Sequence, residues 1–66
     1  MHNTMEYKGY VGSVEFSESD GCFFGKVLDV PALISYEGTS TAELAEDFRT
    51  AVDDYLALRE AERNAP

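Results

Sequence analysis

The sequence has little that could cross-link a small fold: one cysteine, one histidine, two prolines and no tryptophan among 66 residues. One cysteine cannot form an internal disulfide, and one histidine cannot build a zinc site. A chain of this mass buries only about 60% of the surface that its unfolded form exposes. We therefore expect association with a second copy or with another protein to contribute to its stability.

Long apolar segments are also missing. No stretch approaches the roughly 18 consecutive apolar residues of a membrane-spanning helix, and the first eight residues contain no signal-peptide core. The lone thiol, Cys22, agrees with a reducing compartment. The sequence thus predicts a cytoplasmic protein without a membrane segment.

Positive charge is scarce. The sequence has five Lys and Arg but thirteen Asp and Glu, which gives a formal net charge of -8. That balance excludes a nucleic-acid binder that works through a basic patch of its own. With 44% hydrophobic and 12% aromatic residues, the chain is nevertheless too apolar for a disordered tail. We expect it to fold.

The first part of the chain shows the alternation of apolar and polar residues that is typical of strands. Residues 1–6 have no such period and are expected to be frayed. Asp20 and Gly21 supply turn chemistry for a hairpin. Three antiparallel strands are predicted, over Tyr7–Phe16, Cys22–Leu28 and Leu33–Tyr36.

Ser40 followed three residues later by Glu43 is typical of a capping box, and it predicts a helix from about Thr41 onward. At 100° per residue, one side of this helix is an apolar stripe of Leu44, Phe48, Val52 and Tyr55. The opposite side is acidic, with Glu43, Glu46, Asp47, Asp53 and Asp54. Residues 57–66 are expected to form a weakly packed helix end.

Three strands followed by one long helix predict an α+β domain of two layers, with the helix on one face of the sheet, in the order βββα. The other face of the sheet is then partly bare. We expect aromatic residues such as Tyr7, Phe23 and Tyr36 to be available for that face, so that one plausible dimer joins sheets or sheet edges.

The sequence has few residues that could take part in catalysis or bind a metal or cofactor. The only imidazole, His2, is in the expected frayed end, and Cys22 has no basic neighbour before Lys26 that would activate its thiol. No glycine-rich phosphate loop is present. We therefore predict no catalytic, cofactor-binding or metal-binding residues.

The adjacent acidic pairs on the helix admit three interpretations, of which a divalent-ion site is the first. Neighbouring helical residues point about 100° apart, which suits a metal ion poorly. A solvated helix face is the second interpretation, and a docking surface for a basic protein is the third. The candidate partner-binding residues are Glu46, Asp47, Asp53 and Asp54.

Three segments carry a resemblance to a known family: the turn DGCFFGKV, the strand and loop LISYEG, and the helix segment FRTAVDDYL. In their order and spacing, between Tyr7 and Leu56, they resemble the HicB antitoxins of type II toxin–antitoxin pairs. The resemblance implies that residues 1–66 are a single degenerate RNase H-like domain without nuclease activity. It further implies a protein-binding module whose partner is a small basic HicA-type toxin, an mRNA-cleaving ribonuclease that the antitoxin covers.

Members of that family usually continue into a DNA-binding segment, whereas this sequence stops at Pro66, so we expect no direct DNA binding by this chain. Two alternatives stay open. One is an orphan homo-oligomer without a toxin partner. The other is a Mg²⁺-dependent RNase H-like nuclease, which would need clustered carboxylates.

Overall fold

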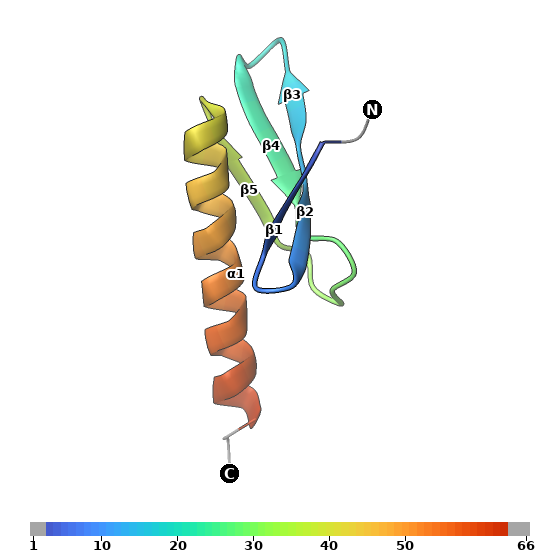
Figure 1. The fold of residues 1–66 in the computed structure, drawn as a ribbon, viewed down its shortest axis with the longest axis vertical. Coiled ribbons are helices and arrows are strands. Elements are labelled where there is room, and N and C mark those ends of the chain that lie inside the picture. The colour runs from blue at the N-terminus through green and yellow to red at the C-terminus, as the bar shows by residue number, and fades with distance from the viewer. Residues whose placement is uncertain (1–2, 64–66) are drawn as a thin grey trace.

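The computed structural model describes residues 3–63, which form five strands and one helix. In chain order these are β1 (Thr4–Tyr7), β2 (Tyr10–Ser13), β3 (Glu15–Ser17), β4 (Cys22–Lys26), β5 (Ser35–Gly38) and α1 (Thr41–Arg63). Strands β3, β4 and β5 make a three-stranded antiparallel sheet, and β1 pairs with β2 in a second sheet (Figure 1). The predicted α+β class, with a three-stranded antiparallel sheet and one long helix, is confirmed.

The expectation of a frayed N-terminus is wrong for residues 4–6, which lie in β1 and pair antiparallel with β2. Lys8 and Gly9 form the connecting turn, and both have positive φ, at 52° and 83°. Two central residues with positive φ are the mark of the type I′ turn that suits two-residue hairpins. Met5 and Tyr7 of β1 pack against the core, and this burial holds the hairpin in place. The predictions for residues 1 and 2, His2 included, and for 64–66 fall outside the described residues.

The strand predicted over Tyr7–Phe16 is divided into β2 and β3 at Val14. Both parts nevertheless follow β4 in one register, because Phe16 pairs with Phe23 and Gly12 forms an isolated bridge with Val27. At the break, the backbone N–H of Lys26 donates to the Ser13 hydroxyl at 3.0 Å. A side chain thus replaces the backbone acceptor, and the two sheets are joined through one interrupted strand.

The hairpin predicted at Asp20 and Gly21 is present, with Gly21 at a φ of 65° between β3 and β4. The strand predicted over Cys22–Leu28 corresponds to β4. The third strand is displaced, because β5 begins at Ser35 and its pairing with β4 extends to Gly38. Leu33, predicted to lie in that strand, belongs to the preceding loop and is 87% exposed.

Helix α1 begins at Thr41, as the capping box predicts. The Glu43 backbone N–H donates to the Ser40 hydroxyl at 3.2 Å. The Glu43 carboxylate accepts from the backbone N–H of Thr39 at 3.0 Å and from the Thr39 hydroxyl, one residue further back than in the usual box. These bonds, chiefly the one from the Thr39 hydroxyl, lower the pKa of Glu43. No helix within residues 3–63 is long and apolar enough to cross a membrane.

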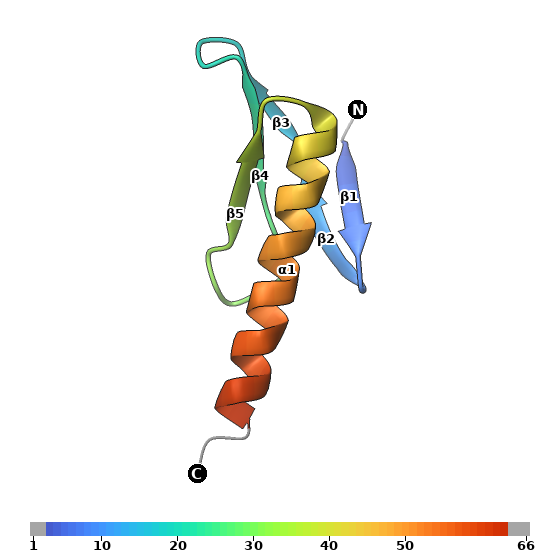
Figure 2. The same ribbon diagram turned by 90° about the vertical axis from the view of Figure 1, so that its left-hand side faces the viewer.

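The core lies between α1 and the strands. Leu44, Phe48 and Val52 are each 1% exposed and form one cluster with Val27 and Tyr36. Tyr55, which was also predicted in the apolar stripe, is only half-buried and meets the Tyr10 ring edge-on at 5.9 Å. Beyond this point α1 extends past the sheet (Figures 1 and 2), and the side chains of 57–63 are exposed. Arg59 still reaches back to the Tyr10 hydroxyl at 3.2 Å.

Two glycines make room for the buried Tyr36. Its ring packs on Phe48 at 5.1 Å between centroids, and its hydroxyl donates to the Ser13 carbonyl at 2.6 Å. A Cβ on Gly12 would lie 2.7 Å from the Phe48 ring and would collide with the Tyr36 hydroxyl. A Cβ on Gly25 would collide with the Ser13 carbonyl oxygen. Burial raises the pKa of Tyr36.

The aromatic residues expected on the bare sheet face are therefore placed elsewhere. Tyr36 is 4% exposed beneath the helix, and Tyr7 and Phe23 pack against the core. The expectation is wrong because the strand register places Phe23 and Tyr36 on the face of the sheet that α1 covers, and Tyr7 of β1 also packs against the core. Phe24, the neighbour of Phe23, is the β4 aromatic left 40% exposed.

We predict that Gly25→Ala lowers the free energy of unfolding by about 1–3 kcal/mol, because the added methyl forces the Ser13 carbonyl away from the Tyr36 hydroxyl. Urea unfolding followed by circular dichroism measures this loss. Ser35→Ala, at an exposed position of β5, is the control and should change stability little. Equal unfolding midpoints for Gly25→Ala and the parent chain would contradict the packing described.

Candidate functional site

Charge lies at the surface of this protein. All thirteen carboxylate side chains are exposed, and no charged side chain of the described part is buried. Within residues 3–63 a single ion pair forms, between Lys8 and Asp53. The negative charge is therefore directed outward, where it acts on whatever approaches the protein.

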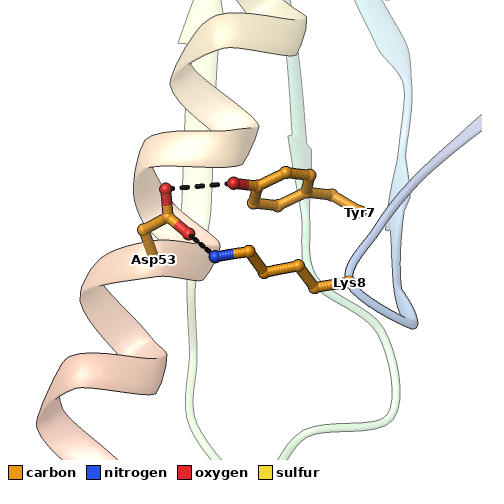
Figure 3. A network of polar contacts seen from close by, with 3 residues as sticks. All are labelled: Tyr7, Lys8 and Asp53. Carbon is orange, nitrogen blue, oxygen red and sulfur yellow. Dashed lines mark hydrogen bonds and ion pairs between the residues drawn. The ribbon is translucent and has the colours of Figure 1, made fainter.

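Asp53, a predicted partner-binding residue, ties α1 to the first hairpin (Figure 3). Its carboxylate accepts from the Lys8 ammonium at 2.9 Å and from the Tyr7 hydroxyl at 3.2 Å. The positive-φ turn between β1 and β2 brings Lys8 to this position. The hydrogen bond from Lys8 lowers the pKa of Asp53, and the same bond raises the pKa of Lys8. Asp53 has a structural contact that the sequence did not predict.

Asp47 also makes an internal contact. Its carboxylate accepts from the backbone N–H of Glu37 at 3.0 Å. Strand β5 is an edge of the three-stranded sheet, so this N–H has no strand to pair with. Asp47 satisfies it and helps to shield the edge from pairing with another chain.

Glu46 and Asp54 are the two candidates without such a role. Both are exposed, and neither side chain has a hydrogen bond or an ion pair with another residue of 3–63. The four candidates thus do not form one uniform docking face. Two are engaged with the strands on either side of the helix, and two are available to a partner.

An apolar patch lies between the loop before β5 and the C-terminal half of α1. Leu33 is 87% exposed and Leu58 is 58% exposed. Together they line a shallow groove with Ala32, Ile34, Ala51 and Tyr55, and the polar Ser35 and Asp54 line it as well. Sequence reasoning missed this patch because it assigned Leu33 to a strand and included Leu58 in a weakly packed helix end.

A second surface feature lies on the sheet. The strand register pairs Phe24 with Glu15 on one side and with Glu37 on the other. All three residues are exposed. We call this set the Glu15–Phe24–Glu37 row; it was not predicted, because the sequence alone does not determine the strand register.

Within residues 3–63 no three His, Cys, Asp or Glu side chains gather as a group that could hold a metal ion. Cys22 is a half-buried free thiol at the start of β4. Comparisons with protein-family models, with curated proteins and with solved structures find no match for this chain.

We predict that Lys8→Gln raises the Asp53 pKa toward its ordinary value of 3.8, because it removes the charge-assisted hydrogen bond from Lys8, and a neutral amide donates only a weaker one. Carboxyl carbon shifts followed by NMR through an acid titration measure it. Glu43, whose pKa is lowered by Thr39, serves as the internal control and should not move. An unchanged Asp53 titration would mean that the ion pair is absent in solution.

The Lys8–Asp53 ion pair also determines how the stability of the fold changes at acidic pH. The folded-state pKa of Asp53 lies below 3.8, so its contribution to stability is present above that pH and is lost as the pH falls through the folded-state pKa. Lys8→Gln should therefore reduce the loss of stability on acidification below pH 3.8 relative to the parent chain.

Proposed function

We propose that this chain is a HicB-like antitoxin module that binds a small basic HicA-type toxin and covers its mRNA-cleaving surface. The observation that supports this most directly is the distribution of charge, with thirteen exposed carboxylates and one ion pair within the described residues. A surface that binds RNA is basic. Opposite charge accelerates the encounter of two proteins and suppresses wrong partners.

The positions of the resembling segments are consistent with this proposal. DGCFFGKV spans the hairpin end and β4, LISYEG includes β5, and FRTAVDDYL is the best-buried part of α1. These segments supply the core residues Val27, Tyr36, Phe48 and Val52. The segments that carry the resemblance are therefore those that build the domain, which we propose to be RNase H-like.

In this proposal the chain works by protein contact. It performs no catalysis, needs no cofactor and acts in the cytoplasm. Its net charge of -8 is repelled by nucleic-acid phosphates, so we propose that it makes no direct contact with DNA.

Co-expression with any small basic protein that is encoded beside its gene tests the proposal. Growth rescue and co-purification of the two proteins in low and moderate salt are the expected results. A basic neighbour that stays toxic and does not co-purify, while the 66-residue chain is folded, would reject the antitoxin function.

Self-association without a toxin partner is the second candidate, and the exposed Leu33 and Leu58 favour it. Exposed apolar patches on small domains mark protein interfaces. A second copy that covers this patch would also add burial to a domain with a small core.

We predict that Glu46→Lys with Asp54→Lys slows capture of the toxin on the order of tenfold at low salt, because these carboxylates steer the encounter. The salt dependence of association should weaken, whereas dissociation should change little. Stopped-flow association at several salt concentrations measures both. Glu6→Lys with Glu18→Lys, which changes the net charge equally, is the matched control; equal slowing by both variants would contradict a role for this helix face.

If the chain self-associates through the apolar patch, Leu33→Ser with Leu58→Ser should shift it to monomer. Sedimentation equilibrium of the parent chain and the variant measures this shift. Ala57→Ser, at another exposed position of α1, should leave the assembly unchanged. A parent chain that is already monomeric would remove the second candidate.

A further inference from the structure

The Glu15–Phe24–Glu37 row lies on the face of the sheet turned away from α1. Residues directly opposite in antiparallel strands point to the same face, and successive residues point to opposite faces. Gly25 and Tyr36, which follow Phe24 and precede Glu37, form the next pair, and the Tyr36 ring packs against Phe48 of the helix. The row therefore points to the open side of the domain.

Phe24 is unusual for an aromatic residue on a central strand. It is 40% exposed and lies outside the hydrophobic cluster. Its neighbour Phe23, by contrast, packs against Phe16 in a tilted arrangement, with the ring centroids 4.9 Å apart. Within residues 3–63 the Phe24 ring has no aromatic partner and no cation above it. The exposed part of this side chain is available for contact.

The two glutamates flank this ring. Each lies one strand spacing from Phe24, so that their backbones are about 10 Å apart across the row. Lys26, two residues along β4, points to the same face but makes no ion pair with either glutamate among the described residues. The row thus presents an aromatic residue between two carboxylates, and a group of another molecule can contact all three.

We propose that the Glu15–Phe24–Glu37 row receives an arginine side chain of the basic partner; this inference rests on the proposed function. A guanidinium group is planar, stacks on an aromatic face and donates several N–H groups in its own plane. The ring then contacts the face of the guanidinium, and the glutamates on either side accept its hydrogen bonds. A lysine ammonium is a compact, strongly hydrated charge and uses such a site less well.

Charge also argues against a second copy on this face. Two copies stacked with their rows in register would bring Glu15 and Glu37 against the same residues of the other copy, and like charges in close contact are destabilising. The acidic face of α1 differs in another way, because Glu46 and Asp54 have no exposed aromatic ring between them. In this inference Glu46 and Asp54 speed the association of a basic protein, whereas the Glu15–Phe24–Glu37 row slows its dissociation.

The row can be tested without a toxin, by NMR titration of the ¹⁵N-labelled chain with the peptide amide Ac-Arg-Arg-Arg-NH₂. The citrulline peptide of the same length is the uncharged control. Shifts at Glu15, Phe24 and Glu37 are expected with arginine and not with citrulline, and Phe24→Leu should abolish them. The same shifts should survive in Glu46→Gln with Asp54→Gln. Shifts centred on α1, or an undiminished response in Phe24→Leu, would overturn the inference.

The second test measures dissociation of the complex with the basic partner that the co-expression experiment identifies. Phe24→Leu and Glu15→Gln with Glu37→Gln should each speed dissociation about tenfold and change association little. Phe16→Leu is the matched control, because Phe16 is 53% exposed on the adjacent strand and points to the other face.

The two tests separate failure of the inference from failure of the proposed function. If the parent complex is stable and its dissociation rate is unchanged in the Phe24 variant, the inference about the row is wrong and the proposed function is unaffected. Absence of any complex with the parent chain would overturn the antitoxin function, and the peptide titration would then decide whether the row binds arginine. Circular dichroism of each variant before use confirms that it is folded.

Discussion

The hydroxyl of Tyr36 donates to the carbonyl of Ser13 at the place where β2 passes into β3, and most of the domain is arranged around this contact. It requires glycine at positions 12 and 25, because a side chain at either position would occupy the space of the hydroxyl or of the carbonyl. The contact lies at the break in the strand and ties Ser13, the last residue of β2, to β5, whose Tyr36 ring packs on Phe48. A five-residue buried cluster is thereby enough to organise five strands and a helix.

A core this small contains no charge within the described residues, so the acidic residues have separate tasks at the surface. Some complete the fold: Glu43 closes the start of α1, Asp47 satisfies the edge of β5, and Asp53 holds the first hairpin. Others have no internal task and are free to act on a partner. The net charge of the sequence does not distinguish acidic residues that stabilise the fold from those that are available to a partner.

Sequence reasoning succeeds where a local rule decides the outcome. Ser40 and Glu43 locate the helix start, and Asp20 with Gly21 locates a hairpin. It fails where tertiary contacts decide. The Lys8–Gly9 turn has an unusual lysine at positive φ and is stabilised by Asp53, 45 residues away, and the start of β5 follows from its register with β4 rather than from the apolar Leu33. The helix wheel gives the angles of the acidic residues but not which strand each one meets, and the exposure of Phe24 rather than Phe23 follows from that same register.

Strand order along the chain and strand order in space nearly coincide, because each ladder joins segments that follow one another in sequence. Such a meander needs only short loop closures, which favour rapid folding. Ribosomes extend a chain at roughly 5–20 residues per second, whereas a hairpin forms within microseconds. Both hairpins are therefore free to form during synthesis, and the steps that wait for the second half of the chain are the pairing of β5 with β4 and the docking of α1 over Tyr36.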